Sequence, residues 1–239
     1  KGNRSEWVPL HAVNHPAMFK PVLIATTIVL LGASETTAQT RRMEAALHIG
    51  PTLGWLRGNR IIDGSGVLPG LAASATLDYS FSKHFGIRAG FGYHRKGMSQ
   101  EVTLTDNHGN VVREVIAFHR LDYLVVPLMA RASFGNKARL VVGAGMYGGI
   151  LMRSEQDRGD EQSFPTTDNT KDMEPWELGV SASLGGAFRL GEQVDLLAEV
   201  RYDKGLTNIS ALPVVDDGSI RTNALCLMVG FGYPFGSTR

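Results

Sequence analysis

Charged residues at alternate positions of the chain offer the first candidate chemistry. In several segments polar and apolar residues alternate, and eight charged side chains lie on the polar side of this alternation. They are Glu44, Arg88, Arg131, Arg139, Glu177, Arg189, Glu199 and Arg201. Paired carboxylates can perform acid–base catalysis when their surroundings separate their pKa values. Buried charges can instead form ion pairs that only fill space. The pattern favours the structural network, with Glu199 between Arg201 and a facing arginine as its centre.

A glycine-rich segment resembles a dinucleotide-binding fingerprint. Gly143, Gly145 and Gly148 follow an apolar run at 140–142. Such a site requires a helix that begins at the third glycine. Here the alternation continues through Gly149 and Ile150, so no helix is expected. These glycines are better explained as space for large side chains that pack against this segment.

The sequence gives little support for a metal site or a catalytic nucleophile. The histidines lack the spacing of a metal site, and the single cysteine, Cys226, is read as a small buried residue. The segment 153–174 holds seven acidic and three basic residues. It offers ligands for divalent cations or a basic partner, but a solvated acidic loop is the simpler interpretation. We therefore expect no catalytic residue, cofactor or metal, and predict that the protein is not an enzyme.

Composition narrows the class of protein further. The chain has 239 residues, 28 glycines, 43% hydrophobic residues and a net charge of +1. The hydrophobic content argues against disorder, and the charge gives no sign of a nucleic-acid partner. One cysteine excludes an internal disulfide.

The N-terminal region reads as a targeting segment. A basic residue, a short apolar run and small residues over 18–38 indicate a secretory signal peptide, with Thr36 and Ala38 at the −3 and −1 positions. Its apolar run is too short for a spanning helix. Residues 1–17 read as vestigial upstream sequence, and 39–239 as the folded domain.

From residue 44 onward the hydrophobic pattern has a period of two, which is typical of strands. Eight alternating segments are expected, at 44–56, 70–81, 84–94, 123–134, 139–150, 176–189, 194–202 and 225–235. A hairpin around 107–110 is expected to extend the third and fourth strands. The prediction is an all-β, eight-stranded antiparallel up-and-down barrel.

Three features favour a transmembrane barrel over a soluble one. Short connections at 82–83, 135–137 and 191–192 alternate with long ones at 57–69, 152–175 and 203–221. The apolar stretches approach the 9–11 residues of a tilted spanning strand. Aromatic residues also gather near both segment ends, as in membrane interfaces. These belts comprise Trp55, Phe85, Tyr93, Phe134, Trp176, Phe188, Tyr202 and Phe235.

Three segments resemble the PorT-like outer-membrane β-barrel family of Bacteroidota. The segment 121–131 resembles its "YL-x-hydrophobic-Pro-Leu" strand, 143–149 its glycine-rich following strand, and 199–209 its "RY-x-x-GLTNI" segment. Ala38-Gln39 is also similar to a signal cleavage site common in that phylum. The resemblance implies an eight-stranded outer-membrane barrel and no particular activity.

The expected function is a structural or surface-binding role in the bacterial outer membrane, without catalysis. The expected partners are the lipid bilayer, the barrel-assembly machinery and an extracellular ligand at the loops 57–69, 152–175 and 203–221. A narrow channel or transport component is the first alternative, although side chains fill an eight-stranded lumen. A soluble periplasmic ligand-binding barrel is the second.

Overall fold

The computed structural model divides the chain into two units, Lys1–Ala38 and Gln39–Arg239. It describes residues 42–60, 62–105, 108, 111–157, 166–190, 193–214 and 218–235. The upstream segment 1–17, the signal peptide 18–38, the turn 191–192 and most of the tip 107–110 lie outside these residues. Within the described part, no helix has the length and apolarity needed to cross a membrane.

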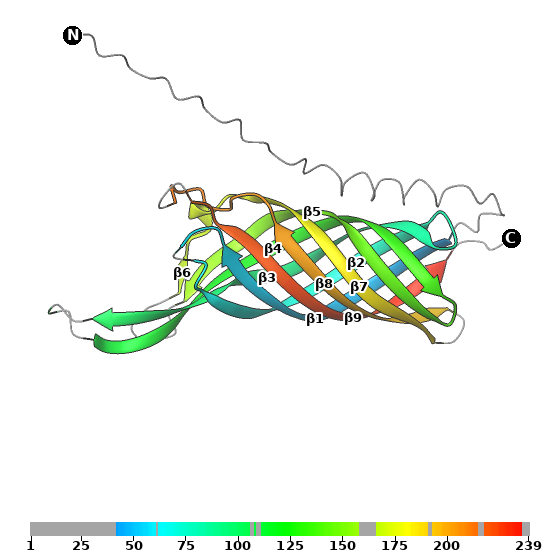
Figure 1. Cartoon of the computed structure of the whole chain (residues 1–239), viewed down its shortest axis with the longest axis horizontal. Helices are drawn as coiled ribbons and strands as arrows, with labels where there is room; N and C mark the ends of the chain where they lie inside the picture. Colours follow the sequence, from blue (N-terminus) through cyan, green and yellow to red (C-terminus); the bar gives the residue numbers. More distant parts are fainter. Residues whose placement is uncertain are drawn as a thin grey trace, which may run out of the picture. The chain divides into compact units, whose positions relative to one another are not determined.

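The second unit consists almost entirely of strands (Figure 1). A single 3-10 turn, η1 (Thr170–Asp172), interrupts them. The strands are β1 (Arg42–Arg57), β2 (Gly66–Ser80), β3 (Phe85–Thr105), β4 (Val111–Gly135), β5 (Ala138–Asp157), β6 (Thr167–Asp168), β7 (Trp176–Leu190), β8 (Val194–Gly205) and β9 (Arg221–Phe235).

Eight of the strands close into a ring. The sheet order is β4-β3-β2-β1-β9-β8-β7-β5-β6, and β4 also pairs with β5. All the strand pairs are antiparallel, and β6 is a short addition to β5 outside the ring. The seam between β1 and β9 runs from Met43–Phe235 to Arg57–Arg221. The predicted eight-stranded antiparallel barrel is therefore confirmed.

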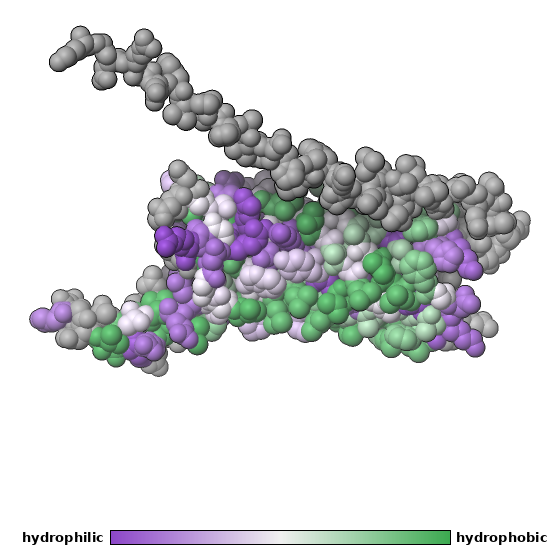
Figure 2. Space-filling model, in the orientation of Figure 1, coloured by the Kyte–Doolittle hydropathy of each residue, from purple (hydrophilic) through white to green (hydrophobic). Residues whose placement is uncertain are grey.

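The barrel carries its apolar side chains on the outside. Leu47 is 67% exposed and Phe231 61%, whereas the large charged side chain of Arg201 is only 2% exposed and points inward. Figure 2 shows hydrophobic residues along the wall and hydrophilic residues toward both ends. A water-soluble barrel would have the opposite arrangement, because exposed apolar area costs about 25 cal/mol per Å² in water. The soluble periplasmic alternative is wrong.

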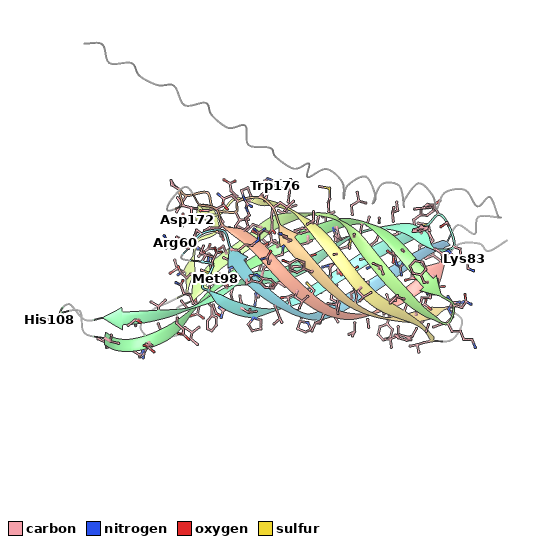
Figure 3. The ribbon with its side chains drawn as sticks, viewed as in Figure 1. Arg60, Lys83, Met98, His108, Asp172 and Trp176 are labelled. Atoms are coloured by element: carbon pink, nitrogen blue, oxygen red, sulfur yellow. The ribbon has the colours of Figure 1, made fainter. Side chains whose placement is uncertain are left out.

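The strands are longer than predicted at the loop end. β5 continues to Asp157, seven residues beyond its expected end, because β4 still pairs with it from Phe118–Asp157 onward. A register shift between Asp122 and Tyr123 accommodates this extension. The predicted hairpin is present: β3 and β4 run past the rest of the barrel (Figure 1), with His108 labelled at the tip in Figure 3. The turn end carries the label of Lys83.

Candidate functional site

The polar lumen is the largest concentration of ionisable groups in the described chain. Strand alternation directs the polar parity inward, and ion pairs then join residues from distant strands. The groups near the short turns, called here the turn-end cluster, are Glu44, Asp78, Arg88, Arg131, Arg139, Arg189, Asp195 and Glu199. The four carboxylates and four guanidinium groups of this cluster balance in charge.

Asp78 on β2 links two arginines from neighbouring strands. Arg88 on β3 donates from Nε to Asp78 Oδ1 over 2.7 Å and also donates to Glu199 across the barrel. Arg131 on β4 donates to the other oxygen of Asp78. These side chains are nearly inaccessible to solvent, so each charge depends on its partner for compensation.

Asp195 on β8 provides a second link, close to the turns. Arg139 on β5 donates to Asp195 and, over 2.9 Å, to Glu44 on β1. Arg189 on β7 donates to Asp195 Oδ1 over 3.1 Å. The ion pairs therefore connect strands on opposite sides of the ring.

A separate loop-end cluster surrounds Lys96 on β3. Its Nζ lies 3.1 Å from Glu177 Oε1 and 3.1 Å from the hydroxyl of Tyr147, and both charged side chains are fully buried. The hydroxyls of Tyr147 and Thr222 donate to the same carboxylate oxygen. Lys96 also lies 4.4 Å from the ring centroid of Tyr147 and 5.3 Å from that of Tyr123. Cation–π contacts of this kind strengthen when water is excluded.

His94, Asp203 and Cys226 complete the loop-end cluster, with one possible metal-ligand atom each within 4.8 Å of one another. Arg201 occupies their surroundings: its Nε lies 3.3 Å from Asp203 Oδ1, and its Nη2 donates to the His94 ring. A divalent cation here would face the positive charge of Arg201 with only one carboxylate in the group to compensate it. The arrangement fits an ion-pair network better than a metal centre.

The gap at the turn-end cluster is very small. A gap lined by His48, Arg88, Arg131, Val141 and Glu199 leaves about 10 Å³. That volume is at the lower limit for one water molecule. Among the described residues, this gap leaves no room for a substrate beside the carboxylates of the turn-end cluster.

Glycines on the inner wall make room for the aromatic side chains. A Cβ atom at Gly179 would lie 2.4 Å from the ring of Tyr147, and one at Gly149 would lie 3.2 Å from the ring of Tyr123. Gly143 and Gly145 lie within β5, which continues to Asp157 without a helix, so the dinucleotide fingerprint has no structural basis. Gly148 lies on the outward parity of β5, and its added Cβ would meet nothing closer than 3.9 Å.

The aromatic belt residues lie on the outer wall. Phe85, Phe134, Phe188 and Phe235 are 39–48% exposed near the turn end. At the loop end Trp176 is 64% exposed, and Trp55 stacks on Tyr202 with ring centroids 6.0 Å apart. The hydroxyl of Tyr93 donates to Asp122 over 2.6 Å. These positions correspond to the two ends of the apolar band.

The acidic segment 153–174 is only partly a loop. Its first residues extend β5, and the rest includes β6 and η1, whereas 158–165, with Asp160 and Glu161, lies outside the described residues. His119 on β4 bonds Ser154 over 3.0 Å and Asn169 over 3.2 Å, which ties η1 to the barrel beyond the apolar band. Burial lowers the pKa of His119. Figure 3 labels Asp172 and Met98 at this end.

Sequence reasoning identified part of this site. All eight predicted lumen residues lie in the two clusters. Glu199 pairs with a facing arginine, Arg88, as expected, whereas Arg201 pairs with Asp203. The prediction of Glu199 as centre missed the residues that link several partners, namely Asp78, His94, Lys96, Asp195 and Asp203. Each lies on the inward parity of its strand, so continued alternation was the signal that could have found them.

Comparison with solved structures finds other small barrels. Neisserial surface protein A is 13% identical with a TM-score of 0.47, covering 80% of this chain and 97% of that one. The outer membrane protein OprG from Pseudomonas aeruginosa is 14% identical with a TM-score of 0.46, covering 83% and 98%. The attachment invasion locus protein Ail of Yersinia pestis is 13% identical with a TM-score of 0.41, covering 80% and 98%. No curated protein sequence matches significantly.

The family comparison covers most of the barrel. The family described as outer membrane protein beta-barrel domain matches residues 37–211 of the 239. That range includes β1 to β8, and the outward apolar wall and inward charges are those of a membrane barrel. The chain belongs to the outer membrane protein beta-barrel family, and it is a protein of the bacterial outer membrane.

Proposed function

We propose that this protein is a non-catalytic outer-membrane barrel with a closed lumen, whose loop end binds ligands or surfaces outside the cell. The observation that carries the proposal is the lumen itself. Its carboxylates are joined to arginines or to Lys96, and a gap of only about 10 Å³ lies between them. A closed interior leaves the loops as the part that meets other molecules.

The surface for this role lies at the loop end. The β3–β4 hairpin extends beyond the ring, and Val111, Val112 and Ile116 on it are 49–67% exposed. Exposed apolar side chains on a hairpin that projects beyond the ring favour contact with another surface. With the connections after β1 and β8, the hairpin forms the candidate adhesion face.

Conductance in planar bilayers tests the closed lumen. The full chain should add no stepwise current to the bilayer, because fixed ion pairs occupy the lumen at two levels. Stepwise currents from the folded protein would overturn the closed-lumen proposal and favour the narrow channel.

Adhesion of intact cells tests the surface role. Cells that display the protein should adhere to polystyrene more than cells without it. The triple variant Val111→Ser, Val112→Ser, Ile116→Ser should lose most of the gain, whereas Thr103→Ser on the same hairpin should keep it. Equal adhesion of the triple variant, at equal surface expression, would contradict the proposal.

We further infer the route to the membrane. Secretion with removal of 18–38 predicts Gln39 as the first residue of the mature protein, which N-terminal sequencing checks. Residues 1–17 should then be absent from the mature chain, and 39–239 should form the barrel domain. Insertion by the barrel-assembly machinery predicts unfolded protein in the periplasm when that machinery is depleted.

We also propose that the chain belongs to the PorT-like branch of Bacteroidota. The segments 121–131, 143–149 and 199–209 support this placement through their motifs. A phylogenetic tree of the family tests it: the chain should group with that branch, and a grouping elsewhere would contradict the proposal.

A further inference from the structure

The outer wall at the loop end has two charged regions. In one the arginines pair with carboxylates, and in the other the cations lack such partners. On β3, β4 and β5, three arginines of this region each have a carboxylate partner. Arg95 bonds Asp122 over 2.7 Å, Arg120 lies 3.2 Å from Asp157, and Arg153 pairs with Glu155. This face is neutral.

On β1, β9 and β8, three cations occur together without such partners. They are Arg57, Arg221 and Lys204, called here the basic triad. Arg57 and Arg221 are direct cross-strand partners, and Lys204 is paired with Asn223, two residues from Arg221 on the same face of β9. In the described chain, none of the three forms an ion pair with a carboxylate. Like charges in opposed positions repel each other unless an anion lies between them.

The side chain of Arg57 brings the triad together. It lies across β9, donating from Nε to Asn223 Oδ1 over 3.2 Å and from Nη2 to the carbonyl of Gly205 over 2.7 Å. These bonds hold its guanidinium at the carbonyl of Gly205, the residue that follows Lys204 in β8. Among the described residues its Nη1 group has no hydrogen-bond acceptor, so it is available to a ligand. The Nε of Arg221 is buried and lacks a hydrogen-bond partner among the described residues.

The surface below the triad suits a lipid. Trp55 and Tyr202 stack directly beside it, at the level of the outer aromatic belt. Farther toward the turn end, Leu227 and Val229 on β9 and Val200 on β8 are 45–58% exposed on the apolar wall. A molecule lying here would meet cations at one end and apolar side chains along its length. That arrangement matches an anionic headgroup joined to acyl chains.

We propose that Arg57, Lys204 and Arg221 bind the phosphate group of a phosphorylated lipid in the outer leaflet. Short turns of such barrels face the periplasm, so the triad lies at the outer interface. Arginine presents planar pairs of N–H donors that match phosphate oxygens, and Lys204 adds a mobile positive charge. The bound phosphate relieves the repulsion between Arg57 and Arg221.

The test uses the refolded full chain in a neutral detergent, titrated with bis-phosphorylated lipid A and with the same lipid after removal of its phosphates. Retained lipid is counted by native mass spectrometry. The phosphorylated lipid should bind at least about tenfold more tightly than the dephosphorylated one, since each cation near a lipid surface contributes measurably. The triple variant Arg57→Gln, Lys204→Gln, Arg221→Gln should lose this preference.

The matched control is Arg95→Gln, Asp122→Asn, which removes a pair from the neutral region and should bind the lipid like the wild type. Heat-modifiable gel migration confirms that each variant is folded. Should a folded triple variant retain the wild-type preference, the proposal is overturned. Complete displacement of the lipid by millimolar inorganic phosphate would also overturn it, because the site would then hold free phosphate without using the acyl chains.

Discussion

Lys96 and Glu177 form an ion pair of 3.1 Å at which neither side chain is accessible to solvent. Glu177→Gln should therefore lower the free energy of unfolding by about 3–5 kcal/mol, because it leaves a buried ammonium without its counter-charge. The double variant Lys96→Met, Glu177→Gln should be more stable than Glu177→Gln alone. Urea unfolding in detergent micelles measures both, with exposed Glu101→Gln as control. Equal stability of Glu177→Gln and wild type would show that the pair contributes little.

Asp78 should matter more than Glu199 in the turn-end cluster. Asp78→Asn weakens the compensation of both Arg88 and Arg131, and should destabilise the barrel by about 3–5 kcal/mol. Glu199→Gln should cost about 1–3 kcal/mol, because Arg88 retains Asp78. Heat-modifiable migration against temperature ranks the two variants. The reverse order would mean that Glu199, rather than Asp78, is the centre of the cluster.

A methyl group added at Gly179 should destabilise the barrel, because the neighbouring atoms leave no space for it. Gly179→Ala would place a Cβ atom 2.4 Å from the ring of Tyr147 and 2.6 Å from the carbonyl oxygen of Lys204. Overpacking of this kind typically costs about 1–3 kcal/mol. Gly148→Ala is the control, since its nearest neighbour would be 3.9 Å away. If the two variants unfold at the same urea concentration, the inner wall adapts more easily than its packing implies.

Acidic pH should loosen the attachment of η1 to the barrel. Burial lowers the pKa of His119 below its ordinary value of 6.5, so the detached state binds a proton more readily than the attached state. Attachment is therefore fully stable above about pH 6.5 and weakens as the pH falls through that value toward the lowered pKa. Hydrogen exchange of the amides at 169–173 should accelerate at pH 5 relative to pH 7.5, after correction for intrinsic rates.

The control for this effect is His119→Gln, which retains hydrogen-bonding groups but does not titrate. Its corrected exchange rates should show no such dependence on pH. A pH response of equal size in this variant would assign the effect to another group.

The alternation of residues was sufficient to predict the ring of strands and the direction of each face. Leu47 and Glu44 on β1, three residues apart, lie on opposite sides as their parity requires. The ends of β5 could not be predicted, because Arg153 and Asp157 look like loop residues until the extended β4 pairs with them. A strand that extends beyond the bilayer has polar residues on both faces. The alternation of apolar and polar residues that predicts a strand is therefore missing there.

The specific ion pairs were also beyond the sequence. Glu199 and Arg201 share a parity and lie close in the chain, which suggested a pair between them. The stagger of the barrel instead brings Arg88 on β3 to Glu199 on β8, while Asp203 takes Arg201. Such contacts depend on how far each strand slides past its neighbours, a quantity that alternation does not encode.

The seam between β1 and β9 determines which chains can close into a barrel in the membrane. Because the first and last strands of the ring are partners, a chain that stops before Arg221 has no complement for either free edge. Lipid tails form no hydrogen bonds with the backbone groups at such edges, so a shortened chain is not stable in the bilayer. Closure of the ring therefore requires β9, and we expect copies that lack this strand to remain outside the bilayer, accessible to proteases.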